Sequence, residues 1–109
     1  MNGFPPIPAG EFVIYGSFIV PILQADEVAL KIMEITKLAE SEKGTLHYCI
    51  SADTIDRNRF HLFERYESEA AFQHHMNQPL VTELFTGGLL SDVKLNILKP
   101  LLPVDGRSG

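Results

Sequence analysis

The sequence has few of the features that metal, disulfide or thiol redox chemistry requires. Cys49 is the single cysteine, so no internal disulfide can form, and no CxxC pair or Cys/His cluster is present to bind zinc. The adjacent His74 and His75 lack the i, i+4 spacing and the accompanying carboxylate of a helical metal site. These absences predict a protein with no bound metal and favour a reducing compartment.

Basic residues and long hydrophobic runs are also scarce. The 9 Lys and Arg residues against 14 Asp and Glu residues give a net charge of -5, which leaves no basic field for a phosphate backbone. The longest apolar stretch, residues 12–23, is shorter than the roughly 20 residues of a membrane helix and contains Pro21. Residues 1–10 lack the cationic and apolar regions of a secretion signal. We therefore expect no nucleic acid and no membrane as partner, and a cytoplasmic location.

Motifs for phosphate binding and acyl chemistry are missing as well. Gly87-Gly88 has neither the spacing nor the lysine of a phosphate-binding loop, and no Gly-x-Ser-x-Gly segment is present. With 109 residues, of which 45% are hydrophobic, the chain is long enough to bury one core without covalent cross-links. The predicted organisation is a flexible arm over residues 1–10, one domain over residues 11–100 and a tail over residues 101–109.

The first half of the chain predicts a strand and a helix. Residues 12–20 are β-branched and aromatic at both parities, which is typical of a strand covered on both faces. Asp26 is expected to cap a helix, and Lys43-Gly44 is expected to close it with a cation and a left-handed glycine. The apolar positions at helical spacing are Val28, Ile32, Ile35 and Ala39.

The second half predicts a hairpin, a helix and a last strand. Residues 45–51 and 59–66 alternate with a period of two on either side of a polar loop. Ser68 is expected to cap a helix that Pro79 breaks or bends, and residues 80–86 to form another short helical turn. A strand that ends at Pro100 follows. The order βαββαβ predicts an α+β, ferredoxin-like antiparallel sheet with the helices on one face.

The sheet face that the helices leave open is expected to be partly apolar. The strand over residues 12–20 is apolar at both parities, and Phe63 lies opposite in parity to Phe60 and Leu62. Pairing of two sheets about a two-fold axis would cover such a surface. The sequence therefore predicts a homodimer.

Three segments carry a resemblance to a known family. They read Gly-Thr-Leu-His-Tyr over residues 44–48, Arg-Phe-His-Leu-Phe-Glu-Arg-Tyr-Glu-Ser over residues 59–68, and Ala-Ala-Phe-Gln-His-His-Met over residues 70–76. The chain resembles the antibiotic-biosynthesis-monooxygenase domain over roughly residues 12–98. In that family Glu-Arg-(Trp/Tyr)-Glu-Ser leads into a helix with Ala-(Phe/Leu/Tyr) and His-(Leu/Met). The resemblance implies a dimeric α+β barrel, in which dioxygen oxidises a quinol or polyphenol without a bound cofactor.

The resemblance also implies site residues. Tyr66 takes the place of the aromatic residue that ends the third strand, and Phe72 takes that of a pocket aromatic on the second helix. His75 stands where the family often has histidine, whereas Leu80 replaces the second histidine of many members, which weakens a two-histidine mechanism. No histidine near Phe85 is available as an axial ligand, so heme is not expected.

We expect His75 to act as the base, because the ordinary pKa of histidine suits proton abstraction near neutrality. Tyr66 would orient a substrate oxygen. The alternatives are a surface or backbone-bonded His75 and a Tyr66 that only packs. Expected substrate contacts are Phe72, Met76, His47, Tyr15 and Leu62, which replaces a polar amide of some members. For His47 and Tyr15, a place in the core or at an interface is favoured over contact with the substrate.

Glu64 and Arg65 point to opposite faces of their strand, so each needs its own partner. Ion pairing across the dimer is the expected role, whereas a buried Glu64 would have a raised pKa or accept a charge-assisted hydrogen bond.

Two other functions stay open. A non-catalytic dimeric module of the same fold would bind a small apolar ligand or serve as an assembly unit. An RNA-recognition module shares the βαββαβ order, but residues 59–66 lack the glycines of that motif and the chain is acidic.

Overall fold

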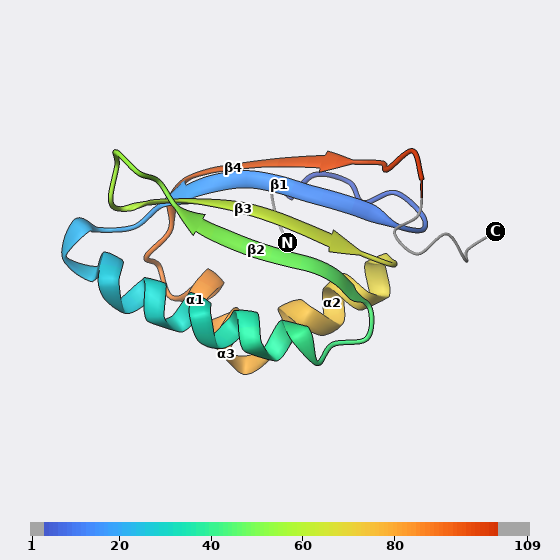
Figure 1. Cartoon of the computed structure of the whole chain (residues 1–109), viewed down its shortest axis with the longest axis horizontal. Coiled ribbons are helices and arrows are strands. Elements are labelled where there is room, and N and C mark those ends of the chain that lie inside the picture. The colour runs from blue at the N-terminus through green and yellow to red at the C-terminus, as the bar shows by residue number, and fades with distance from the viewer. Residues whose placement is uncertain (1–3, 103–109) are drawn as a thin grey trace.

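The structure, a computed structural model, describes residues 4–102 and contains a four-stranded antiparallel sheet. The strands lie in the order β2-β3-β1-β4, and the helices cover one face of the sheet (Figure 1). The α+β, ferredoxin-like arrangement predicted from the sequence is confirmed. The elements in chain order are β1 (Phe12–Ile19), the 3-10 helix η1 (Ile22–Gln24), α1 (Ala25–Glu40), β2 (Thr45–Ala52), β3 (Arg59–Tyr66), α2 (Glu69–Met76), α3 (Pro79–Thr86) and β4 (Ser91–Leu98).

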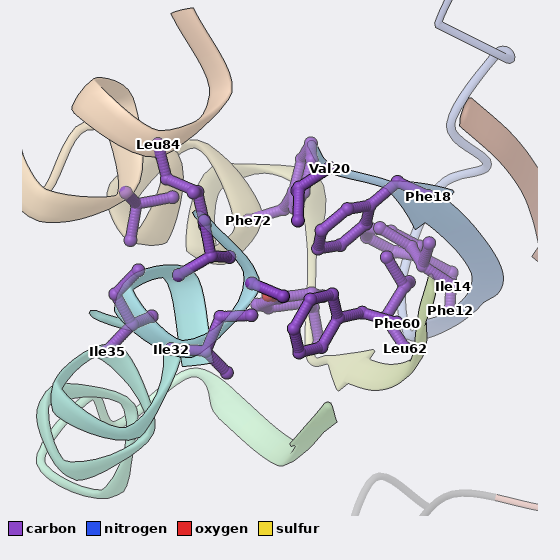
Figure 2. Packing of buried hydrophobic residues seen from close by; sticks show 14 residues of the cluster. Phe12, Ile14, Phe18, Val20, Ile32, Ile35, Phe60, Leu62, Phe72 and Leu84 are labelled. Carbon is purple, nitrogen blue, oxygen red and sulfur yellow. The ribbon is translucent and has the colours of Figure 1, made fainter. Parts of the chain in front are cut away.

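The core lies between the sheet and the helices. Alternate residues of β1 and β3 point toward the helices, because side chains of a strand alternate between its two faces. Phe18 and Phe60, on neighbouring strands, stack with ring centroids 5.6 Å apart within this cluster (Figure 2). The strand and helix residues that form the centre of the core are Phe12, Ile14, Phe18, Val28, Ile32, Ile35, Phe60, Leu62, Tyr66, Phe72, Val81 and Leu84.

The N-cap of helix α1 lies two residues before the predicted one. Gln24 is the N-cap residue, since η1 runs directly into the helix, and Asp26 lies in the first turn with Glu27. The prediction of Asp26 as the cap was therefore wrong. Carboxylates in the first turn still interact favourably with the positive end of the helix dipole.

Gly44 has a different role from the one predicted. Helix α1 ends at Glu40 with Ser41 as C-cap, and Gly44 does not have a positive φ. A Cβ on Gly44 would lie 2.4 Å from the Cβ of Ala71, so the residue permits close contact between the start of β2 and α2. The expectation of a left-handed cap was wrong, because the pattern near a helix end does not reveal what packs against it.

The second helical region is divided at the predicted proline. Ser68 caps α2 as expected, because its Oγ accepts a hydrogen bond from the N–H of Ala71 at 3.2 Å. Pro79 stands in the first turn of α3, where its missing N–H costs no helical hydrogen bond. Helices α2 and α3 lie on the same side of the sheet as α1 (Figure 1).

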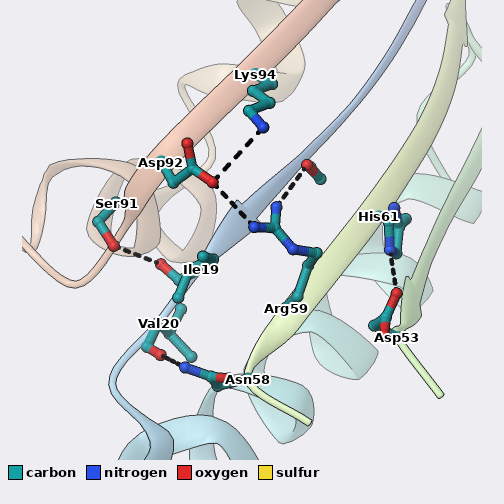
Figure 3. A network of polar contacts seen from close by, with 10 residues as sticks. Ile19, Val20, Asp53, Asn58, Arg59, His61, Ser91, Asp92 and Lys94 are labelled. Atoms are coloured by element: carbon teal, nitrogen blue, oxygen red, sulfur yellow. Dashed lines mark hydrogen bonds and ion pairs between the residues drawn. The ribbon is translucent and has the colours of Figure 1, made fainter. Parts of the chain in front are cut away.

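A polar network holds the strand ends together (Figure 3). The Asn58 side chain donates to the carbonyl of Val20 at 2.8 Å. Arg59 donates to Ser17 Oγ at 3.0 Å and to Asp92 Oδ2 at 2.9 Å. One guanidinium of β3 thus reaches β1 and β4 on the face away from the helices.

The segment before β1 lies against the domain from Phe4 onward. Phe4 and Ile7 are half-buried and pack against the core. Residues 1–3 and 103–109, parts of the predicted arm and tail, lie outside the described residues. Within the described range, no helix is both long and apolar enough to cross a membrane.

Candidate active site

A cavity of about 520 Å³ lies on the helix side of the sheet. Its volume falls in the range of small-molecule sites. The strands and helices β1, β3, α2 and α3 contribute Ile14, Leu62, Glu64, Phe72, Met76 and Phe85. The N-terminal segment, β4 and the residue before β4 contribute Phe4, Pro5, Leu90, Val93 and Leu95. The lining is apolar except for Glu64, the one ionisable side chain among these residues.

Glu64 combines contact with the cavity and almost complete burial. It lies on β3 and is 5% exposed. Burial raises the pKa of Glu64 to about 7; a hydrogen bond from Tyr66 acts against this rise and the charge of Glu42 adds to it. A carboxyl group with such a pKa can accept and return a proton near neutrality.

Tyr66 lies behind Glu64 and holds it. The Tyr66 hydroxyl donates to Glu64 Oε1 at 2.5 Å, and the two residues share a face because they are two positions apart on β3. Burial, the charge of Glu64 and this hydrogen bond raise the pKa of Tyr66 far above its usual range, so its hydroxyl stays protonated. Its ring packs against Phe72 and Phe12, with centroids 5.2 and 5.7 Å away.

A second buried acid is paired with His75. Glu42 Oε1 lies 2.7 Å from His75 Nδ1, and the two side chains are 4% and 2% exposed. Thr45 and Gln78 donate to the same carboxylate at 2.8 and 3.1 Å. Burial acts to raise the pKa of Glu42, but the hydrogen bonds from His75, Thr45 and Gln78 outweigh it, and the pKa lies below its ordinary value. An ionised carboxylate only accepts, so Nδ1 of His75 is the donor.

Tyr48 lies between these two acids. It is the β-sheet partner of Glu64, and its ring centroid is 4.9 Å from that of His75. Its buried hydroxyl has no hydrogen-bond partner among residues 4–102. Burial and the charges of Glu64 and Glu42 raise the pKa of Tyr48 well above its usual range. We refer to Glu42, Tyr48, Glu64, Tyr66 and His75 as the buried acid cluster.

The family model for antibiotic biosynthesis monooxygenases matches residues 12–86. The chain belongs to this family. The match includes the whole buried acid cluster and the cavity residues of β1, β3, α2 and α3, but neither Phe4 and Pro5 nor β4. No curated protein matches the chain significantly.

Solved structures share the monooxygenase-family fold over most of the chain. A Bacteroides thetaiotaomicron protein, described provisionally as an antibiotic biosynthesis monooxygenase, is 21% identical with a TM-score of 0.76, covering 87% of this chain and 93% of that one. A Nitrosomonas europaea protein with the same provisional description is 16% identical, with a TM-score of 0.74 and coverage of 91% and 98%. A Pseudomonas aeruginosa protein is 21% identical, with a TM-score of 0.72 and coverage of 89% and 99%.

Of the predicted site residues, Leu62, Phe72 and Met76 meet at the cavity of this family member. Their contact with a substrate stays a prediction. His75 and Tyr66 lie behind the wall in the buried acid cluster, with ring centroids 5.7 Å apart.

His47 and Tyr15 lie on the sheet face away from the helices. Tyr15 is 45% exposed, and His47 is exposed and packs on Phe63 with ring centroids 5.5 Å apart. Neither lines the cavity, so their proposed substrate contacts have no support there. The sequence does not say which face of a strand meets the helices, so it could not assign either residue to the cavity or to the opposite face of the sheet.

Glu64 and Glu42 were not predicted as site residues. For Glu64 a signal was present, since it shares parity with Phe60, Leu62 and Tyr66 on an otherwise apolar face. Glu42 lies two residues after the end of α1 and two residues before Gly44, a context typical of an exposed acid. Within residues 4–102, no group of three or more His, Cys, Asp or Glu side chains could hold a metal ion.

Proposed function

We propose that this member of the family is a cofactor-independent monooxygenase that oxidises a small phenolic aromatic with dioxygen. The observation that carries the proposal is the position of Glu64, an acid with a pKa of about 7 in the wall of an otherwise apolar cavity. The apolar lining suits an aromatic ring, and a single acid is enough to handle the one proton that must leave the substrate hydroxyl.

The reaction balances with dioxygen as the only other reactant. Glu64 takes the phenolic proton, and the resulting anion transfers an electron to dioxygen. The two radicals combine at the ring carbon para to the hydroxyl, and Glu64 returns the proton to give a hydroperoxide. Loss of that carbon's hydrogen with the distal oxygen, as water, leaves a carbonyl. The sum is a phenol with a free para C–H plus dioxygen going to a para-quinone plus water.

The structure makes Glu64 a better candidate for the base than His75. His75 is buried and uses Nδ1 in its contact with Glu42, and it does not line the cavity. Tyr66 is a positioning residue, because it contacts the carboxyl group of Glu64 rather than the cavity. We propose that the contact between Glu42 and His75 holds α2 in place and so supports the cavity wall that carries Phe72.

We also propose that the protein works as a homodimer. The sheet face away from the helices exposes Tyr15, Phe63 and Leu98 at 45%, 45% and 46%. These side chains lie on three adjacent strands, and a second copy would cover them in a two-fold symmetric contact. Sedimentation at micromolar concentration should then give twice the chain mass, and Phe63→Glu should give the mass of one chain.

An oxygen electrode tests the enzymatic proposal. Metal-stripped protein is given 1-naphthol and other phenols whose para position is free. We expect oxygen uptake with formation of 1,4-naphthoquinone, and one atom from labelled dioxygen in the new carbonyl. Glu64→Gln should lower kcat by roughly 100-fold or more with little change in KM, because the base is lost while the cavity keeps its shape.

The matched control is Glu34→Gln, an exposed acid on α1, which should keep full activity. Undiminished activity of Glu64→Gln would contradict the assignment of the base. If no phenol consumes oxygen although 1-naphthol binds, the protein is instead a non-catalytic ligand-binding module of this fold.

A further inference from the structure

Some residues that line the cavity lie within the part of the chain that the family model matches, and others lie outside it. Ile14, Leu62, Glu64, Phe72, Met76 and Phe85 lie within the residues that the family model matches. Phe4 and Pro5 precede that region, yet they line the same cavity. One wall of the site is therefore built by a segment that the shared family pattern does not include.

The Phe4 ring extends an aromatic group that reaches the buried acid cluster. Its centroid lies 5.3 Å from that of Phe72, in a tilted contact. Phe72 in turn packs edge-on against Tyr66, the residue that holds Glu64. A planar ligand whose hydroxyl meets Glu64 thus has an aromatic surface available toward Phe4.

The segment is held in this position from outside the cavity. Lys99 donates from Nζ to the carbonyl oxygens of Ala9 and Glu11, at 2.5 and 3.0 Å. Gly10 between them has a φ of 79°, and a Cβ there would lie 3.1 Å from Lys99 Nζ. The turn between this segment and β1 therefore favours glycine because of its positive φ, and a side chain at Gly10 would crowd the Lys99 ammonium group.

The composition of the segment also lowers the entropy cost of ordering it. Pro5, Pro6 and Pro8 have fixed φ angles, so the chain has fewer conformations to lose when it packs. Ile7, between the prolines, is half-buried against the core and gives the segment a second anchor.

We propose that Phe4 and Pro5 form a ligand-contacting wall of the cavity, which the rest of the segment up to Gly10 holds in place, and that the Phe4 ring makes the cavity prefer shorter planar aromatic ligands. The inference rests on the proposed function in that the cavity receives the phenolic substrate. It concerns binding alone, so it can fail or hold separately from catalysis. In the absence of the Phe4 ring, the cavity would be longer and would contact a short ligand less.

The test measures the equilibrium binding of 2-naphthol, which has two rings, and of 9-phenanthrol, which has three. Calorimetry under nitrogen gives both affinities without oxidation of the ligand. For Phe4→Ala we expect 2-naphthol to bind about two- to tenfold more weakly, the fold-change of one lost aromatic contact. Binding of 9-phenanthrol should weaken less, so the ratio of the two affinities shifts toward the longer ligand.

Two further variants separate the wall from general damage. Lys99→Met removes both hydrogen bonds to the segment without changing a lining residue, and it should shift the affinity ratio in the same direction by a smaller factor. Leu23→Ala removes a side chain that is 96% exposed on η1, and it should leave both affinities unchanged.

Unchanged affinities in Phe4→Ala would overturn the inference. Tighter binding of 2-naphthol would also overturn it, because the Phe4 ring would then obstruct the ligand instead of contacting it. If the ratio of the 2-naphthol and 9-phenanthrol affinities does not change in Phe4→Ala, Phe4 does not select ligands by length. Normal binding without oxygen uptake would leave the inference standing and refute the proposed enzymatic function instead.

Discussion

Two carboxylate–histidine pairs in this protein have the same chemistry and the same length but different surroundings. Glu42 and His75 lie 2.7 Å apart with side chains 4% and 2% exposed. Asp53 and His61 also lie 2.7 Å apart, but their side chains are 25% and 51% exposed (Figure 3). Water and salt screen the second pair and can solvate either partner alone, whereas a group left without its partner in the first pair stays buried.

The two acids also owe their low pKa values to different contacts. The pKa of Asp53 falls to about 2 mainly because the N–H of Asp56 donates to it, with further help from His61 and the N–H of Ile55. These partners belong to one hairpin. The pKa of Glu42 is lowered against the effect of burial by His75, by the nearby Thr45 and by Gln78, and His75 and Gln78 follow it in the chain by more than 30 positions. The buried pair therefore joins distant segments and the exposed pair orders a loop.

Loss of the buried histidine should have the largest effect. His75→Ala leaves the Glu42 carboxylate buried without its main partner, and we expect the free energy of unfolding to fall by about 3–5 kcal/mol. Urea denaturation at pH 7 measures this value. His74→Ala, at the exposed neighbouring position on α2, is the control and should stay close to the parent. Equal losses in both variants would show that burial of the pair does not matter.

The second largest effect is the pH dependence of stability that Glu64 causes. The pKa of Glu64 is about 7 in the folded protein against an ordinary 4.5, so the unfolded chain loses this proton first as pH rises. Stability contributed by Glu64 is full below pH 4.5 and falls until pH passes about 7, by roughly 3 kcal/mol in all. Glu64→Gln should lack this fall in urea titrations at pH 4.5 and 7.5. Parallel pH profiles of parent and variant would refute the raised pKa.

Glu42 should show the opposite pH dependence. Its folded pKa lies below 4.5, so its contribution is present above pH 4.5 and is lost as pH falls through the folded value. The stability difference between the parent and Glu42→Gln should therefore shrink in acid. A difference that grows below pH 4.5 would contradict the assignment of an ionised Glu42.

Replacement by phenylalanine should change the free energy of unfolding in opposite directions at the two tyrosines of the cluster. Tyr66→Phe removes the donor to Glu64 and should lower the free energy of unfolding by about 1–3 kcal/mol. Tyr48→Phe removes a buried hydroxyl that has no partner among residues 4–102, and it should raise stability by about 1 kcal/mol. Thermal unfolding of both variants at pH 6 measures the contrast. A destabilised Tyr48→Phe would mean that its hydroxyl takes part in a hydrogen bond.

The smallest effect is expected at the exposed pair. His61→Ala should unfold at the same urea concentration as the parent within error, and the result should not change with salt, because solvent replaces the lost contact. A loss comparable to that of His75→Ala would remove the distinction between the two pairs.

Much of the fold could be predicted because its signals are local. The alternation in residues 45–51 and 59–66, the cap at Ser68 and the break at Pro79 all depend on neighbours within a few positions. The cavity residues Leu62, Phe72 and Met76 also followed from pattern and resemblance. Errors arose where a distant segment decided the outcome, as at Gly44, which contacts α2 instead of closing α1.

The sequence by itself determined the order of strands and helices and the family, because hydrophobic period, caps and breaks act over short stretches of chain. Only the tertiary structure decided which strand face meets the helices, that Glu42 pairs with His75, and that Glu64 rather than His75 lines the cavity. The physical reason is that the pKa and the partners of a buried group depend on burial and on segments distant in the chain, which no local pattern records.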